Sequence, residues 1–441
     1  MHSKSRRDFL LATGPGAAAL GVAVSAPAHG ADSPEGACFL NVAAFGAVGD
    51  GRAHSGAAFQ RAIDAAESMG GGIVRIPPGE FLLEKTPLIA SGVHLMGSGA
   101  ATILRGLRPE TARGAALISN KGQQARGYDG AHDWSVSHLT INSPDTNGIV
   151  VTHAARVYIG HIYGVDVYHH FVDTAGRDIL CENLFLTGRS GTSTFQIDSL
   201  SGAQTIWDGK QAVSPLLDGT DTENLILQNS IITARAGHTG NHPHHDASVH
   251  FHGDEARGFI FSNLALGGAA TGFYQDANTA YHDIQISNVR SNNPGRALWL
   301  NPGKTRQQNL MVRGFNHTPM TNAETSDAYI GLEIYGREGL LLSDIQLNGK
   351  QVAETAYAVR IGASQFVRID GLQATCLNGR GVWLHDHGDD DDGKIAQTLI
   401  HGCMLQGFDF GFVYDGTADV KAKDNFFRQV AVEYDGAFSR G

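Results

Sequence analysis

The stretch Phe259-Ile260-Phe261-Ser262-Asn263-Leu264 is followed 25 residues later by a similar stretch, Ile284-Gln285-Ile286-Ser287-Asn288-Val289. Both alternate apolar residues with polar ones and place Asn before the last apolar position. Comparable segments recur along the chain, with a turn position at residues 138, 161, 183, 229, 263, 288, 314, 344, 371, 402 and 425. The basic step of 22 to 25 residues is the length of one β-helix coil. Asn or Asp fills six of these eleven positions, which favours an internal ladder of stacked polar side chains.

The composition agrees with a repeat protein built from strands. Of 441 residues 56 are glycine, and charged residues make up 17%, below the ~25% typical of soluble domains. The chain is therefore not collagen-like, disordered or a coiled coil. The net charge of −11 argues against a nucleic-acid-binding protein, because such proteins usually carry a basic surface. Four cysteines are too few for a disulfide scaffold.

The N-terminus has the features of an export signal. Ser5-Arg6-Arg7-Asp8-Phe9-Leu10-Leu11 resembles the twin-arginine signal, and Ala26-Pro27-Ala28 offers a cleavage site. The apolar stretch between them is shorter than the ~20 residues that span a membrane. We expect residues 1–31 to be a signal peptide and the protein to be periplasmic or secreted, with its structured domain at 38–436.

An amphipathic helix is expected near the start of the mature chain. Apolar residues recur at helical spacing behind Ser55, a suitable N-cap: Phe59, Ala62, Ile63 and Ala66. Gly70-Gly71-Gly72 ends the helix, and a short buried strand, Ile73-Val74-Arg75-Ile76, follows. Such a helix would close the open end of a β-helix, so we expect an N-terminal cap at 41–80.

This segment resembles the N-terminus of the pectate-lyase superfamily, which includes polygalacturonase- and rhamnogalacturonase-related proteins. The shared features are Phe45-Gly46-Ala47-Val48-Gly49-Asp50-Gly51, the helix, and Gly70 to Phe81. The resemblance covers about residues 41–105. It implies an all-β, single-stranded right-handed parallel β-helix, here of about 11 coils, and action on a polysaccharide. The acidic residues that usually follow Gly-Asp-Gly are replaced by Arg52-Ala53-His54-Ser55, and the polygalacturonase catalytic motifs are missing.

A second strand follows each turn position, and its alternation separates an inner from an outer face. Since successive side chains point to opposite faces, one column points inward: Ile149, Phe171, Phe195, Val249, Phe273, Leu298, Leu332, Val359, Val382 and Phe412. The outer column, one residue further on, is Val150, Val172, Gln196, His250, Tyr274, Trp299, Glu333, Arg360, Trp383 and Val413. A further outward position holds Asp198, His252, Asp276, Asn301, Tyr335, Gly362 and His385.

The middle of the outer column is predicted to be a substrate groove. Aromatic, histidine and arginine side chains are not what an ordinary solvated face prefers. Long loops at 199–221, 234–246 and 316–329 flank the same coils, and such loops commonly build binding sites. Coils spaced by ~4.8 Å would let the groove span roughly 30 Å, which suits several sugar rings. The predicted substrate-binding residues are Gln196, His252, Arg296, Trp299, Asn301, Arg360 and Trp383.

Two kinds of chemistry fit these residues. Glycoside hydrolysis needs two carboxyl groups, and the candidates are Asp198, Asp246, Asp276 and Glu333. Asp198 and Asp276 occupy equivalent positions two coils apart, about 9–10 Å. β-Elimination on a uronate instead needs a base, for which His250 and Tyr274 are candidates, and a cation such as Arg296 or Arg360 that neutralises the carboxylate.

The stretch from His238 to His252 holds six histidines in fifteen residues. Its spacing is not a standard zinc signature, so an active-site histidine cluster is the favoured interpretation and a divalent metal is the alternative. The acidic run Asp389 to Asp392 is interpreted as a solvated loop tip, with weak Ca²⁺ binding as the alternative. We expect no required cofactor.

The sequence therefore predicts an exported enzyme that degrades a polysaccharide or oligosaccharide. Hydrolysis by paired carboxylates is the first choice and a polysaccharide lyase the second, while a non-catalytic glycan-binding β-helix is a third alternative. The expected partner is the saccharide, without nucleic acid and without a membrane span. A homotrimer is compatible with the sequence, because β-helix proteins often form trimers.

Overall fold

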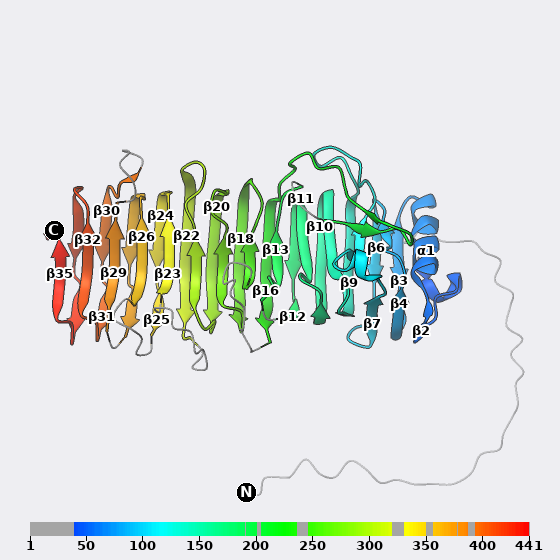
Figure 1. Ribbon diagram of the computed structural model, residues 1–441, viewed down its shortest axis with the longest axis horizontal. Helices are drawn as coiled ribbons and strands as arrows, with labels where there is room; N and C mark the ends of the chain where they lie inside the picture. The colour runs from blue at the N-terminus through cyan, green and yellow to red at the C-terminus, as the bar shows by residue number, and fades with distance from the viewer. Residues whose placement is uncertain are drawn as a thin grey trace, which may run out of the picture. The chain divides into compact units, whose positions relative to one another are not determined.

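The structure is a computed structural model that describes residues 39–189, 191–200, 204–235, 246–319, 330–349, 356–376, 378–386 and 393–440. These residues form a right-handed parallel β-helix whose strands stack coil upon coil from α1 towards β35 (Figure 1). The fold class predicted from the sequence is confirmed. The predicted signal peptide lies outside the described residues.

Three parallel sheets make up the coil, and several long strands bend from the first sheet into the second. The first sheet contains β1 (Phe39–Asn41), β3 (Gly72–Arg75), β6 (Val93–Met96), β9 (His132–Ser143), β10 (Asn147–Val167), β11 (Val172–Glu182), β16 (Glu223–Ala234), β18 (Glu255–Gly267), β20 (Ala280–Ser291), β22 (Gln307–His317), β24 (Arg337–Ser343), β27 (Gln365–Asp370), β30 (Thr398–His401), β33 (Val420–Lys423) and β36 (Phe438–Arg440).

The second sheet adds β2 (Asp50–His54), β4 (Gly79–Leu83), β7 (Thr102–Gly106), β12 (Phe185–Gly188), β25 (Gln346–Asn348), β28 (Gln373–Thr375), β31 (Met404–Gln406) and β34 (Phe426–Arg428) to the ends of the long strands. The third sheet contains β5 (Leu88–Ile89), β8 (Ala116–Asn120), the starts of β10 and β11, β13 (Phe195–Ile197), β17 (Ala247–Phe251), β19 (Thr271–Gln275), β21 (Arg296–Leu300), β23 (Ile330–Tyr335), β26 (Tyr357–Gly362), β29 (Arg380–His385), β32 (Phe410–Asp415) and β35 (Val432–Gly436).

The helix α1 (Gly56–Ser68) packs on the first coils, beside the short 3₁₀ helix η1 (Val42–Phe45). The predicted apolar side of α1 is buried. Ser55 occupies the N-cap position, but its hydroxyl bonds to Val48 instead of capping the helix. The Glu84 carboxylate accepts hydrogen bonds from Gly56 N at 2.7 Å and Ala57 N at 3.0 Å, and its charge suits the helix N-terminus.

The predicted turn positions mark the bend between the first two sheets. Ten of the eleven have a positive φ, as at His138 (58°), Asn263 (54°) and Asp344 (53°), a conformation that Asn, Asp, His and Gly tolerate best. In the last coil Asp424, not Asn425, takes this conformation. The Asn side chains do form a ladder, with Asn263 Nδ2 donating to Asn229 Oδ1 at 3.0 Å, but the ladder is exposed and not internal as predicted.

The predicted inward column is confirmed apart from one coil. Strand register joins Phe195, Val249, Phe273, Leu298, Leu332, Val359, Val382 and Phe412 in one row, and all are fully buried. In β11, however, Val172 and not Phe171 pairs with Ile149 and Phe195. The outer residue of that coil is therefore Asp173 and not Val172.

Candidate functional site

The predicted outer column forms one continuous row on the third sheet. Register places Asp173, Gln196, His250, Tyr274, Trp299, Glu333, Arg360, Trp383 and Val413 side by side on successive strands. None of these residues belongs to the main apolar core cluster. The row therefore brings together the ionisable and aromatic side chains that the sequence singled out.

Much of this row is covered, which the sequence did not predict. Gln196, His250, Tyr274 and Glu333 are buried, as is Asp198 in the neighbouring row. The more accessible side chains are His252 (38% exposed), Asp276 (25%), and Arg296 and Arg360 (26% each). A substrate can therefore reach only part of the predicted set directly.

The segment after β13 explains the burial at the N-terminal end of the row. It carries the short strands β14 (Ile206–Trp207) and β15 (Ala212–Val213) and runs back along the coil, where Trp207 O accepts a hydrogen bond from Thr86 N (Figure 1). Ile206 packs on Ala116 and Val150. The predicted long loop therefore covers the side chains at this end of the row.

His252 lies between two carboxylates. Its Nδ1 is 3.0 Å from Asp198 Oδ1, and its Nε2 is 3.7 Å from Asp276 Oδ2. The hydrogen bond to Asp198 raises the pKa of His252 to about 9, against the opposing effect of burial. His252 is therefore a cation at neutral pH, next to the accessible Asp276 carboxylate.

Asp198 is held as a carboxylate by several donors. Gln196 Nε2 and Gln204 Nε2 donate to its Oδ2 at 2.8 and 2.6 Å, and Ser199 N donates to its Oδ1 at 2.8 Å. Burial works against the charged form, but these bonds and His252 hold the pKa of Asp198 below its ordinary value. A buried carboxylate that already accepts four hydrogen bonds is a poor proton donor to a substrate.

His250 and Tyr274 contact Asp276 from the buried side. His250 Nε2 is 3.1 Å from Asp276 Oδ1, and its Nδ1 is 2.9 Å from Ser193 Oγ. The rings of His250 and Tyr274 are 5.1 Å apart. Burial, then the charge of Asp276, raises the pKa of the Tyr274 hydroxyl. Tyr274 therefore keeps its proton at neutral pH, so it fits a proton donor better than the base that the sequence suggested.

Asp173 and Gln204 are site residues that sequence reasoning missed. Burial, and then the charge of Asp198, raises the pKa of Asp173 well above its ordinary value. Its Oδ1 has no hydrogen-bond partner among the described residues. Two adjacent apolar residues, Phe171 and Val172, allowed two strand registers. Only pairing with both neighbouring coils selects the register that places Asp173 in the outer row.

The next part of the row is basic. Glu333 Oε2 lies 2.8 Å from Arg296 Nε, and its Oε1 lies 3.1 Å from Arg360 Nη1. Tyr335 Oη also donates to Glu333 Oε1, at 2.8 Å. The Arg296 guanidinium lies 3.7 Å from the centre of the Trp299 ring. With two arginines on one buried carboxylate, Glu333 serves as an anchor and not as an accessible catalytic acid.

The remaining predicted residues have different surroundings. Asp246 is fully buried just before β17, so it does not present a carboxylate to solvent. Asn301 Nδ2 donates to the Gln275 carbonyl at 2.8 Å, and Trp383 Nε1 donates to Asp415 Oδ2 at 2.7 Å. Within the described ranges no group of three His, Cys, Asp or Glu residues is arranged to hold a metal ion. Four histidines of the predicted cluster and the Asp389 to Asp392 run lie outside those ranges.

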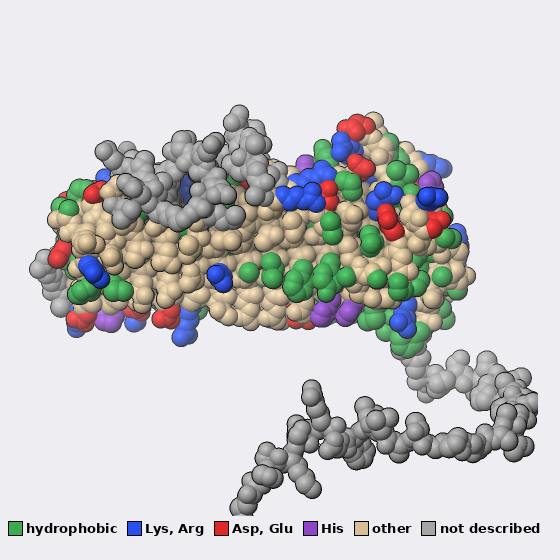
Figure 2. Space-filling model, turned by 90° about the horizontal axis from the view of Figure 1, so that it is seen from below, with side chains coloured by type: hydrophobic (Ala, Val, Ile, Leu, Met, Phe, Trp, Pro, Cys, Tyr) green, Lys and Arg blue, Asp and Glu red, His purple; other side chains and the backbone are tan. Residues whose placement is uncertain are grey.

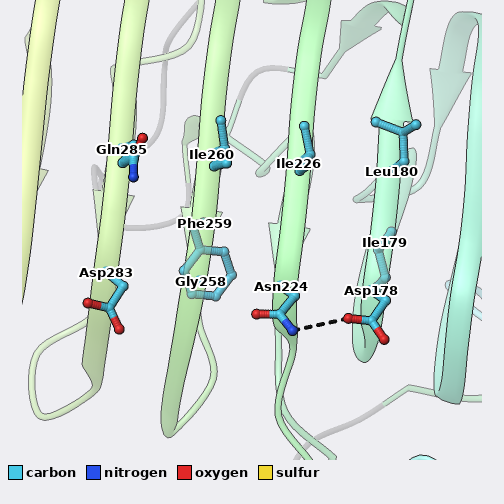
Figure 3. Close-up of a pocket in the computed structure, with 10 residues that line it drawn as sticks. All are labelled: Asp178, Ile179, Leu180, Asn224, Ile226, Gly258, Phe259, Ile260, Asp283 and Gln285. Atoms are coloured by element: carbon cyan, nitrogen blue, oxygen red, sulfur yellow. Dashed lines mark hydrogen bonds between the residues drawn. The ribbon is translucent and has the colours of Figure 1, made fainter.

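Two other surface features of the described residues carry no comparable group of candidate catalytic side chains. A groove of about 470 Å³ on the first sheet is lined by Leu180, Ile226, Ile260 and Gln285, with Asp178, Asn224 and Asp283 at its edge (Figure 3). These last three have positive φ, so backbone conformation accounts for them.

Exposed hydrophobic side chains gather in a row on one face (Figure 2). On the second sheet Tyr163, Phe185 and Ile231 are such side chains and neighbours by register.

Residues 39–313 match the rhamnogalacturonase A/epimerase, pectate-lyase-like family, and the chain belongs to this family. The resemblance seen in the sequence is confirmed.

Individual relatives match over shorter lengths. The chain is 46% identical over 223 residues to mannuronan C5-epimerase AlgE1 of Azotobacter vinelandii, covering 45% of this chain and 15% of that protein. It is 34% identical over 135 residues to alginate lyase 7 of the same organism, covering 28% of this chain and 15% of that protein. The chain covers at most 30% of the length of the first curated relatives it matches.

The structure of the Streptococcus pneumoniae surface protein and adhesin PfbA has the same fold. It covers 91% of this chain and 100% of that chain, with a TM-score of 0.61 and 15% identity. This similarity concerns the fold alone.

Proposed function

We propose that this protein is a polysaccharide-active enzyme that removes the C5 proton of a uronate residue. The observation that carries this proposal is the pairing of an accessible cation with an accessible carboxylate, His252 Nε2 with Asp276 Oδ2 at 3.7 Å. Proton abstraction beside a carboxylate needs both a positive charge that stabilises the developing enolate and a nearby base.

The roles follow from charge and accessibility. His252 is protonated because Asp198 raises its pKa to about 9, and with Arg296 it would neutralise the uronate carboxylate. Asp276 is assigned as the base, because its side chain is the most exposed among the candidate carboxylates Asp198, Asp246, Asp276 and Glu333. His250 contacts Asp276 at 3.1 Å and positions it.

Tyr274 would supply the second proton. Its raised pKa keeps the hydroxyl protonated at neutral pH. In elimination, Asp276 takes the C5 proton, the C4–O4 bond breaks, a C4=C5 double bond forms, and Tyr274 protonates O4. In epimerisation, a proton returns to C5 from the opposite face. Both outcomes share the first step, so one site can be tested for both.

The names of two relatives give independent support for the proposed activity. Their names describe a lyase acting on alginate and a C5-epimerase acting on mannuronan. Both names describe action on polysaccharides, and the second describes chemistry at C5. Export by the twin-arginine route is part of the proposal, because Ser5 to Leu11 resembles that export signal. Within the described residues, no helix is long and apolar enough to cross a membrane.

Hydrolysis is the second candidate, because Asp173 and Asp198 are neighbouring carboxyl groups whose pKa values are shifted in opposite directions. Such a split is typical of an acid and base pair. Asp198, however, already accepts hydrogen bonds from Gln196, Gln204, Ser199 and His252, which makes it a poor proton donor to a substrate. Hydrolysis needs two carboxyl groups at the bond that breaks. Asp276 is the best exposed of the candidate carboxylates, and one exposed carboxylate favours proton abstraction over hydrolysis.

A product assay on a panel of uronate and neutral polysaccharides tests the proposal. Elimination yields unsaturated ends that absorb ultraviolet light, and epimerisation changes the C5 configuration seen by NMR. We expect one of these with uronate polymers and neither with neutral ones. New reducing ends without unsaturation would identify a hydrolase instead, and binding without any product would identify a glycan-binding protein.

A further inference from the structure

A second group of basic and aromatic side chains lies further along the third sheet. It consists of Tyr357 and Arg360 on β26 and Arg380, Trp383 and His385 on β29, and we call it the Arg360 cluster. These residues follow the stretch 39–313 that matches the family. Family membership therefore does not account for them.

Arg360 is held in place by partners on two sides. Its Nη1 pairs with Glu333 at 3.1 Å, and its Nε donates to His385 Nε2 at 3.2 Å. The Glu333 side chain is only 5% exposed and is shared with Arg296, so the three residues together carry one net positive charge. The other Arg360 N–H groups have no acceptor within the described residues, and the side chain is 26% exposed. A pre-positioned guanidinium with spare donors suits a carboxylate.

The aromatic side chains of the cluster stack on each other and hold the neighbouring cations in place. Trp383 stacks on Tyr357 with ring centres 4.9 Å apart and planes 18° apart, and its Nε1 is fixed by Asp415 at 2.7 Å. The guanidinium groups of Arg360 and Arg380 lie 4.5 and 5.3 Å from the Trp383 ring. Cation–π contacts of this kind fix the guanidinium groups next to the rings, and the fixed cations provide charge for the acidic group of a sugar.

The cluster lies in line with the proposed catalytic residues but apart from them. Three strand-to-strand steps separate Tyr274 from Arg360, through Trp299 and Glu333. At ~4.8 Å per step this is about 14 Å, room for two or three sugar rings between the two places. A saccharide lying along the coil axis would therefore reach both.

We propose that the Arg360 cluster is a remote subsite that binds the carboxylate of a second acidic sugar in the same chain. This inference rests on the proposed function, because the proposed catalytic residues define where a uronate chain would lie along the row. Binding at the subsite does not depend on turnover. It follows that affinity rises with chain length and needs the charge of the distant sugar.

Calorimetric binding of uronate hexamers, with their carboxyl-reduced neutral counterparts, tests this inference. Uronate dimers are titrated in parallel. We expect Arg360→Gln to weaken hexamer binding about tenfold, to leave dimer binding unchanged, and to leave the weaker binding of the neutral hexamer unchanged. Arg368→Gln is the matched control, since Arg368 lies on β27 in the first sheet and pairs with Asp370.

The possible outcomes of these titrations distinguish a failure of the proposed subsite from a failure of the proposed reaction. Equal affinity of wild type and Arg360→Gln for every uronate hexamer would overturn the subsite, and so would equal wild-type affinity for charged and neutral hexamers. Arg380→Gln is a second variant with the same expected selectivity, should Arg360→Gln not fold. Loss of hexamer affinity in a protein that forms no C5 product would keep the subsite and reject the proposed function.

Discussion

His252 Nδ1 lies 3.0 Å from Asp198 Oδ1, and this contact ties the accessible part of the site to its buried part. It raises the pKa of His252 to about 9 and helps to lower that of Asp198. The stability from the raised histidine pKa is complete below the ordinary value of ~6.5 and is lost as pH rises through about 9.

The stability of the protein should therefore depend on this pair between pH 7 and pH 10. We expect the advantage of wild type over Asp198→Asn in the free energy of unfolding to shrink across this range. The change should be about 1 kcal/mol, because His252 is 38% exposed and solvent screens the pair. Denaturant titration at both pH values measures it. Asp166→Asn is the control, since the Asp166 carboxylate pairs with Arg189 at 2.8 Å and not with a histidine. An equal change in both variants would contradict the assignment.

Asp173→Asn should be at least as stable as wild type at neutral pH. The raised pKa of Asp173 means that folding favours the neutral acid. Its contribution is complete below an ordinary carboxyl pKa of ~3.9 and declines as pH rises. The stability of Asp173→Asn relative to wild type should thus increase from pH 4 to pH 7 in denaturant titrations. A variant that becomes relatively less stable over this interval would show that Asp173 is an anion in the folded protein.

Glu333→Gln should destabilise the protein by about 3 kcal/mol, because it leaves Arg296 and Arg360 without their shared buried anion. Thermal or denaturant unfolding measures the loss. Asp344→Asn removes an exposed carboxylate 3.4 Å from Arg313 and should cost less than about 0.5 kcal/mol. Similar losses in the two variants would mean that Glu333 is not a buried anchor.

The ladder between the first two sheets gives a prediction about the fold. Asn263 has φ 54° and bonds to Asn229 and Asn288. Asn263→Val should cost about 1–2 kcal/mol or more, because a β-branched residue is strained at positive φ, whereas Asn263→Gly should cost less. Denaturant titration of both variants compares them. A valine variant as stable as the glycine variant would argue against the left-handed turn.

The local features of the fold were predictable from the sequence because each has a local cause. Positive φ selects Asn, Asp, His or Gly, so Asn183 and Gly314 marked turns correctly. Strand alternation placed His250 and Tyr274 in one row. The error at Phe171 arose because Phe171 and Val172 are both apolar, so alternation alone allowed two registers.

The environment of the site was less predictable because it depends on distant contacts. Gln204 reaches Asp198 only because the segment after β13 folds back over the coil. The burial of His250 and the sharing of Glu333 by two arginines likewise depend on neighbouring coils. Residue type identified the participants, whereas packing decided which are accessible and which are charged.

The central claim is that the site takes a proton from C5 of a uronate, and reaction in D₂O tests it most directly. Uronate polymers incubated with wild type and with Tyr274→Phe are analysed by NMR and ultraviolet absorbance. We predict unsaturated ends or deuterium at C5 with wild type, and a loss of at least 100-fold in Tyr274→Phe, the usual scale of one acid–base group. New reducing ends with C5 unlabelled and no unsaturation would contradict the claim.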